Sequence, residues 1–153
     1  MDRTNITLAG GGEETRDLWA PYRAHLLGFM PTAIMDGART LNIVIDASNG
    51  MAGTMVPKVF EAAGKPGVLP PVPGLQIIEI NFDNTKGVFA HEPNPLVAAN
   101  LRQVQEAVVR EKADIGFCYD GDADRCMVID EKGHAVGCDQ IGRASCRERV
   151  FSS

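Results

Sequence analysis

The chain has 153 residues, enough for one domain with a core of its own, and its 44% hydrophobic and 23% charged residues are typical of a globular protein. A net charge of -5 argues against nucleic acid or an anionic membrane surface as a partner. The sequence shows no apolar run of transmembrane length and no amino-terminal signal pattern, so we expect a cytoplasmic location and no membrane partner.

The first two segments are a polar stretch and a helix. Residues 1–15 are polar and rich in glycine, which is typical of a linker or a frayed end. From residue 17 to residue 30, apolar side chains recur at helical spacing and stop before Pro31, which predicts an amphipathic helix. Its apolar positions are Leu18, Trp19, Tyr22, Leu26 and Phe29. Such a helix needs a partner surface to cover this stripe.

A strand, a turn and a second helix are predicted next. Residues 41–47 are rich in β-branched side chains and form the strand, and the turn at 48–53 leads into a helix that runs to about Ala63. The turn could bind an anion at the helix N–H groups, but its spacing fits neither a dinucleotide-binding fingerprint nor a P-loop, and a plain turn is favoured. Ser48 is a possible nucleophile, although serine here is more often a cap or turn residue.

A second strand and a long loop follow. Proline and glycine dominate residues 65–74, which excludes regular structure there, and residues 75–80 have the pattern of a strand. The irregular segment 81–95 is long for a compact domain, and loops of this length are often functional. It contains His91 and Glu92, a possible catalytic or metal-binding pair, but without a second histidine at ligand spacing a structural role is favoured.

The last predicted elements complete an α/β sheet. Residues 113–119 form a third strand, and residues 127–130 pair through a tight turn with a short strand at 135–137. Before them a helix at 96–112 is expected to bury Leu96, Leu101, Val104, Ala107 and Val108. The predicted fold is therefore a three-layer α/β/α domain with a small mixed, mostly parallel sheet.

Three aspartates stand at alternate positions directly after the third strand. Asp120, Asp122 and Asp124 are separated by small residues and followed by Arg125. Negative charge crowded into one turn repels itself unless a hard cation with oxygen ligands, Mg²⁺ or Ca²⁺, lies between the carboxylates. Ligands of open α/β sheets bind at this end of the strands. The sequence therefore predicts a metal site, and a solvated acidic hairpin is the plainer alternative.

The same spacing also fits the first ligands of an EF-hand, with Glu131 at the twelfth position. An EF-hand needs glycine at its sixth position, where this chain has Arg125. Strand-like runs flank the acidic turn where an EF-hand has helices, so we set this interpretation aside.

Three motifs resemble one family. The chain has Asp-Ala-Ser-Asn-Gly-Met-Ala-Gly at 46–53, His-Glu-Pro-Asn-Pro-Leu at 91–96 and Asp-Gly-Asp-Ala-Asp-Arg at 120–125. In this order they resemble the second domain of the α-D-phosphohexomutases, the phosphomannomutase and phosphoglucomutase group. The resemblance extends over about residues 17–140, and it implies that residues 16–140 form the metal-binding domain II of such an enzyme.

The resemblance implies an isomerase that works by phosphotransfer in carbohydrate metabolism. In this family four domains surround a cleft, and a phosphoserine exchanges its phosphoryl group with a hexose 1- or 6-phosphate. By resemblance Asp120, Asp122 and Asp124 would hold Mg²⁺, and Arg125 would act on a phosphate oxygen or orient the carboxylates. The implied partners are a phosphohexose substrate and the missing domains I, III and IV.

The chain departs from the family in two respects. It has no Thr-x-Ser-His-Asn-Pro loop, so the nucleophilic serine is absent, and Ser48 stands where the family usually has glycine. We therefore expect a fragment that is inactive alone and whose sugar preference cannot be assigned. The alternatives are a non-catalytic cation-binding module and a Mg²⁺-dependent phosphatase of another α/β family, although Asp46 does not stand in the DxDx[TV] setting of such a nucleophile.

The final segment, 141–153, is polar and basic and has no apolar stripe. Residues 141–150 resemble one translated reading frame of a sequencing-library adapter. We expect 141–153 to be a non-native tail, and a native basic tail is the alternative.

Overall fold

The computed structural model describes residues 17–60 and 71–137. The predicted end segments 1–15 and 141–153 lie outside the described residues, as do most of the proline-rich loop and the end of the helix predicted to reach Ala63. The elements in chain order are α1 (Trp19–Leu27), α2 (Thr32–Met35), β1 (Leu41–Asp46), α3 (Ala52–Phe60), β2 (Leu75–Ile80), the 3₁₀ helix η1 (Ala98–Leu101), α4 (Arg102–Glu111), β3 (Ile115–Tyr119), β4 (Cys126–Ile129) and β5 (Ala135–Val136).

The sheet is mixed, as predicted. Its strand order is β2-β1-β3-β4-β5, with β1 parallel to both β2 and β3, and β4 antiparallel to β3 and β5. Helical crossovers return the chain for a parallel strand, whereas the short acidic turn between β3 and β4 allows only an antiparallel return. In the register Asp46 pairs with Ile80 and Cys118, so the carboxyl ends of β1, β2 and β3 lie along one edge.

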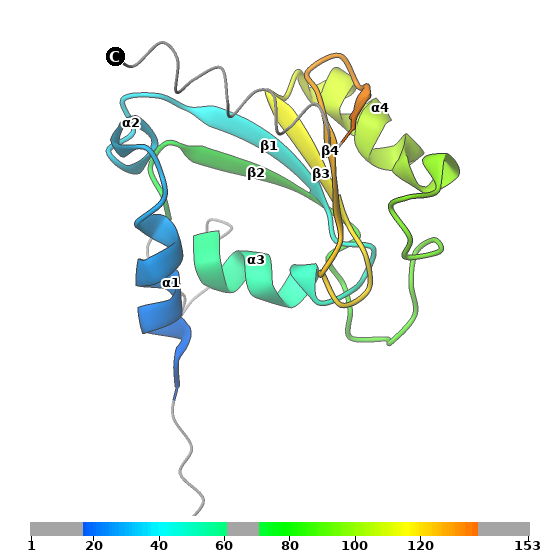
Figure 1. Ribbon diagram of the computed structural model, residues 1–153, viewed down its shortest axis with the longest axis horizontal. Helices are drawn as coiled ribbons and strands as arrows, with labels where there is room; N and C mark the ends of the chain where they lie inside the picture. Colours follow the sequence, from blue (N-terminus) through cyan, green and yellow to red (C-terminus); the bar gives the residue numbers. More distant parts are fainter. Residues whose placement is uncertain (1–16, 61–70, 138–153) are drawn as a thin grey trace, which may run out of the picture.

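The sheet separates two helical layers (Figure 1). Val44 points to the α4 side, where it packs with Val104 and Val108. Its neighbours Ile43 and Ile45 point to the α3 side and pack near Val56. Alternation along β1 therefore supplies both cores, because successive side chains of a strand face opposite sides. The predicted three-layer α/β/α fold is confirmed.

Two helix predictions are wrong in detail. The predicted stripe of α1 is largely uncovered, with Leu18 63% and Phe29 74% exposed, whereas Leu27 is buried. The helix predicted to start at Leu96 instead starts as η1 at Ala98, and Leu96 is 66% exposed. Val97, between this leucine and η1, has extended backbone geometry with φ -91° and ψ 115°, and the Leu96 N–H donates to Asn94 Oδ1 at 3.2 Å, so the chain forms a turn here instead of a helix.

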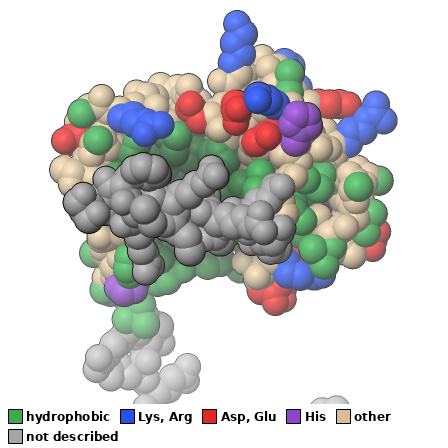
Figure 2. All heavy atoms as spheres, turned by 45° about the horizontal axis from the view of Figure 1, so that its top comes forward, with side chains coloured by type: hydrophobic (Ala, Val, Ile, Leu, Met, Phe, Trp, Pro, Cys, Tyr) green, Lys and Arg blue, Asp and Glu red, His purple; other side chains and the backbone are tan. Residues whose placement is uncertain are grey.

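On the face drawn in Figure 2, acidic and basic side chains are interspersed rather than separated by sign, and hydrophobic side chains lie among them. Within residues 17–60 and 71–137, no helix is both long and apolar enough to span a membrane.

Candidate metal centre

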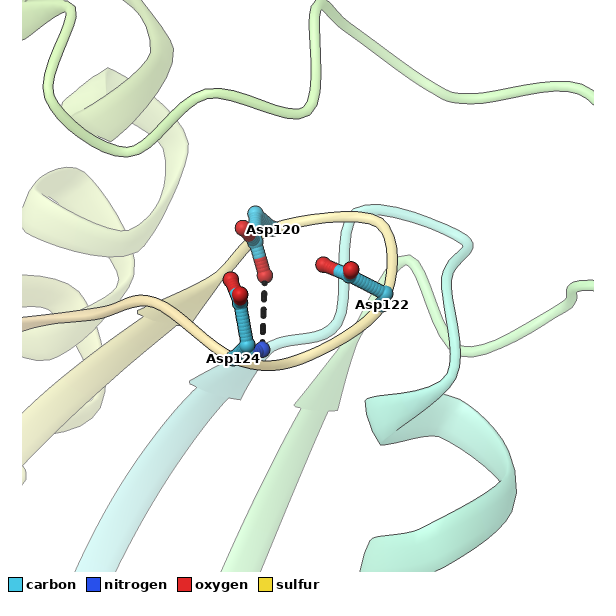
Figure 3. A group of neighbouring side chains, drawn as sticks. All are labelled: Asp120, Asp122 and Asp124. Atoms are coloured by element: carbon cyan, nitrogen blue, oxygen red, sulfur yellow. Dashed lines mark hydrogen bonds between the residues drawn. The ribbon is translucent and has the colours of Figure 1, made fainter.

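The three predicted aspartates lie together on the loop between β3 and β4. One carboxylate oxygen each from Asp120, Asp122 and Asp124 falls within 4.8 Å of the other two. Figure 3 shows the three side chains turned toward one another, with the backbone N–H of Asp124 donating to Asp120 Oδ1. Ala123 makes this turn possible with a left-handed φ of 64°. Three hard oxygens at this spacing could hold a divalent cation.

The carboxylate of Asp120 is the fixed member of this group, because its side chain is fully buried. Its Oδ1 accepts the backbone N–H groups of Asp124 at 3.1 Å and Arg125 at 3.2 Å, and its Oδ2 accepts Arg125 Nε at 2.5 Å. Burial raises the pKa of Asp120, but these hydrogen bonds and the Arg125 charge outweigh it and leave the pKa below its ordinary value. Asp120 therefore carries a negative charge inside the domain.

Asp124 experiences the opposite influence. A hydrogen bond to Asp120 and the negative charges of Asp122 and Asp120 raise its pKa above the ordinary value. Arg125 Nε lies 3.6 Å from Asp124 Oδ1 and opposes this effect. The Arg125 guanidinium therefore lies against the carboxylates of Asp120 and Asp124. A cation among the three side chains would relieve the remaining repulsion.

The turn after β1 packs directly on the acidic loop. Ser48 is buried, and its hydroxyl donates to the carbonyl oxygen of Tyr119 at 2.7 Å, one residue before Asp120. The backbone N–H of Met51 donates to the Gly121 carbonyl at 2.9 Å. A Cβ at Gly50 would lie 2.5 Å from that same carbonyl oxygen, so only glycine fits there.

Ser48 is thus a turn residue, with a left-handed φ of 50°. The structure agrees with the plain turn that the sequence favoured over an anion site, because five of its backbone N–H groups have acceptors within the chain. The donors are Ser48, Asn49, Gly50, Met51 and Gly53.

The long loop at 81–95 covers another side of the acidic loop. The Phe89 ring occupies the space beside Gly121, where a Cβ would meet its Cζ at 3.0 Å. His91 is not paired with the Glu92 carboxylate as a metal or catalytic pair. Its Nε2 instead lies 3.2 Å from Oδ2 of Asp46, a buried carboxylate at the end of β1. His91 therefore joins this loop to the sheet.

Sequence reasoning considered Asp46 only as a nucleophile, which it set aside, and did not single out Asn81; the two residues belong to the same polar network. Asn81 has a left-handed φ of 54° and donates its side-chain amide to Asp46 Oδ1 at 3.0 Å. The available signal was their position, since each stands at or just after the carboxyl end of a parallel strand.

The fold and the acidic loop define an α/β/α domain with a candidate divalent-cation site at the carboxyl ends of its strands. A sequence model described as phosphoglucomutase/phosphomannomutase, alpha/beta/alpha domain II, matches residues 20–133. The chain therefore belongs to the phosphoglucomutase/phosphomannomutase family, of which it contains domain II.

Individual relatives agree with this assignment. A phosphoglucosamine mutase of Corynebacterium glutamicum (strain R) is 34% identical over 130 residues, which cover 84% of this chain and 25% of the relative. A phosphoglucosamine mutase of Frankia casuarinae is 35% identical over 120 residues, which cover 78% of this chain and 23% of the relative. A solved phosphoglucomutase/phosphomannomutase family protein of Burkholderia thailandensis matches 90% of this chain and 27% of its own, with a TM-score of 0.66 and 26% identity. The chain spans about a quarter of these proteins.

Proposed function

We propose that this chain supplies the Mg²⁺-binding loop of a phosphohexomutase. The observation that carries the proposal is the convergence of Asp120, Asp122 and Asp124 within 4.8 Å in a domain that matches domain II of the family. The donor set fits the ion, because Mg²⁺ prefers hard oxygen ligands such as carboxylates. Residues 16–140 are the proposed domain.

The residues have distinct proposed roles. Asp120, Asp122 and Asp124 would hold the ion, and Arg125 would keep the buried Asp120 ionised and oriented. A bound Mg²⁺ would neutralise charge on a phosphoryl group during its transfer. The loop's support by Ser48 and Met51 keeps the carboxylates in place before the ion arrives.

The proposed substrate of the parent protein is a phosphorylated glucosamine, because the relatives described above carry the name phosphoglucosamine mutase. The reaction would move a phosphoryl group between the 1- and 6-positions through a phosphoserine on another domain. Because the chain lacks the family's serine loop, we propose that it is inactive alone. Incubation with glucosamine, glucose or mannose 1-phosphate should yield no 6-phosphate, and measurable turnover would contradict this.

The metal assignment is tested by titrating the isotopically labelled chain with MgCl₂ and following the backbone amide signals of residues 120–125. We expect a saturable shift in the parent and a large loss of affinity in Asp122→Asn. Glu131→Gln is the matched control, because this exposed acid lies outside the loop yet would be the twelfth ligand of an EF-hand. Equal affinity in the parent and Asp122→Asn would overturn the assignment.

A further inference from the structure

A carboxylate that the proposed metal chemistry does not use lies at the end of β1. The Asp46 side chain is completely buried, and it is not one of the three grouped aspartates. Burying a carboxylate is costly unless it is paired and hydrogen-bonded. In the sheet Asp46 pairs with Cys118, and Cys118 stands two residues before Asp120 in the chain.

The partner of this carboxylate is His91, whose side chain is 14% exposed. His91 Nε2 lies 3.2 Å from Asp46 Oδ2, and His91 Nδ1 lies 2.9 Å from the Glu92 carbonyl oxygen. Its ring therefore lies between the backbone of its own loop and the buried carboxylate at the end of β1, with one nitrogen within hydrogen-bond distance of each.

Three separate chain segments donate to Asp46. Oδ1 accepts the Ser48 backbone N–H at 2.8 Å and the Asn81 side-chain amide at 3.0 Å, while Oδ2 accepts His91. The first donor holds the turn whose serine hydroxyl reaches Tyr119 O. The last holds the segment that places Phe89 beside Gly121. Asp46 thus connects the turn that contacts Tyr119 with the loop segment that contacts Gly121, and these two residues flank Asp120.

We propose that Asp46 and His91 are positioning residues for the acidic loop, and that the hydrogen bond between them sets the loop's affinity for Mg²⁺ by fixing the Ser48 turn and the Phe89 segment against it. Neither side chain belongs to the group of carboxylates that could hold the ion, and the Asp46 oxygens already accept hydrogen bonds from within the chain. This inference rests on the proposed Mg²⁺ site.

The test is the same amide titration with MgCl₂, performed on the full 153-residue chain with two variants of one position. His91→Leu removes both ring nitrogens at similar volume, whereas His91→Gln keeps an N–H that can reach Asp46. We expect Mg²⁺ affinity to fall about tenfold in His91→Leu, as when the supports of metal ligands are lost, and to stay within about threefold of the parent in His91→Gln.

Two controls separate positioning from a general loss of stability. His134→Leu removes the other described histidine–aspartate pair, His134 with Asp130, which lies at the far end of β4. Val104→Ala weakens the α4 core without touching the network. Both should keep the parent affinity. If Val104→Ala lowers the affinity as much as His91→Leu does, the positioning role is overturned.

The outcomes distinguish this inference from the proposed function. If the parent binds Mg²⁺, Asp122→Asn does not, and His91→Leu binds like the parent, the positioning role fails and the metal site stands. If the parent shows no shift at residues 120–125, both fail. Should His91→Leu not fold, Asp46→Asn tests the same connection, because the amide keeps the size of the side chain but replaces one accepting oxygen with an N–H₂ group. Unchanged affinity in that variant would overturn the inference.

Discussion

Arg125 Nε lies 2.5 Å from Oδ2 of Asp120, so a side chain that is 50% exposed neutralises one that is completely buried. The ion pair involves the carboxylate that the proposed metal would also use. Arg125 therefore stabilises the loop in the absence of an ion, and a bound cation would share that carboxylate with it.

Removing this guanidinium should destabilise the metal-free chain. Arg125→Gln is expected to lower the free energy of unfolding, since a buried carboxylate loses a charge-assisted hydrogen bond that is only partly screened by water. Mg²⁺ should recover part of the loss by supplying positive charge. Urea unfolding with and without MgCl₂ measures both effects.

The control is Arg102→Gln, which breaks a helical pair whose side chains are 80% and 61% exposed. The loss of unfolding free energy in Arg102→Gln should be much smaller than in Arg125→Gln, because water screens an exposed pair. Equal losses in the two variants would contradict a special role for the Asp120 pair.

Ser48 combines an unfavourable backbone angle with a buried hydrogen bond, and two substitutions separate these effects. Ser48→Ala keeps the left-handed backbone and leaves the Tyr119 carbonyl without its donor, at a cost of about 2 kcal/mol in unfolding free energy. Ser48→Gly loses the same bond but relieves about 1 kcal/mol of strain. Chemical denaturation should therefore rank the glycine variant above the alanine variant, and the reverse order would show that the angle is not strained.

Gly50 should tolerate no side chain, because a Cβ there would lie 2.5 Å from the Gly121 carbonyl oxygen and 3.0 Å from that of Asp120. Gly50→Ala is expected to cost about 3 kcal/mol, since backbone on both sides must move. Gly87→Ala is the matched control, with a φ of 62° and open space around its Cβ, and should cost only about 1 kcal/mol. Similar unfolding midpoints for the two variants would refute the close packing of the turn on the acidic loop.

The β4–β5 turn should make stability depend on pH through Asp130. Backbone N–H groups of His134 and Lys132 donate to its Oδ1 and lower its pKa below the ordinary value of 3.8. A lowered pKa in the folded state gives stability that is present above pH 3.8 and is lost as the pH falls through the folded-state pKa.

Asp130→Asn mimics the protonated side chain, so it should be less stable than the parent at neutral pH, and the gap should close in acid. Urea unfolding of both chains across this range measures the gap. A gap that stays constant with pH would contradict the assignment.

The helices and strands were predictable where buried apolar side chains recur at a regular spacing along the sequence. The strand at 75–80 and the buried positions Leu101, Val104, Ala107 and Val108 were predicted correctly, because these side chains face the α4 core or pair in the sheet. The apolar stripe of α1 was predicted to need a partner surface, but the sequence could not show where that surface lies. Periodicity indicates which side chains share a face and not whether the described residues cover it.

The acidic loop was predictable because its spacing alone crowds three carboxylates together, although binding of Mg²⁺ stays a prediction. The network around Asp46 was not predictable. A lone aspartate at a strand end carries no sequence signal for donors at Asn81 and His91, which are 35 and 45 residues away. Only the fold brings these three residues to one edge.

The two edges of the sheet are unequal. Among the strands of residues 17–60 and 71–137, the six-residue β2 lies at one edge and the two-residue β5 at the other. An unpaired strand edge is a template for further strands, and its length sets how many hydrogen bonds a newcomer gains. On heating or at high concentration, chains should therefore aggregate by adding strands to β2 rather than to β5. The charge of the exposed Glu79 on β2 should slow this addition.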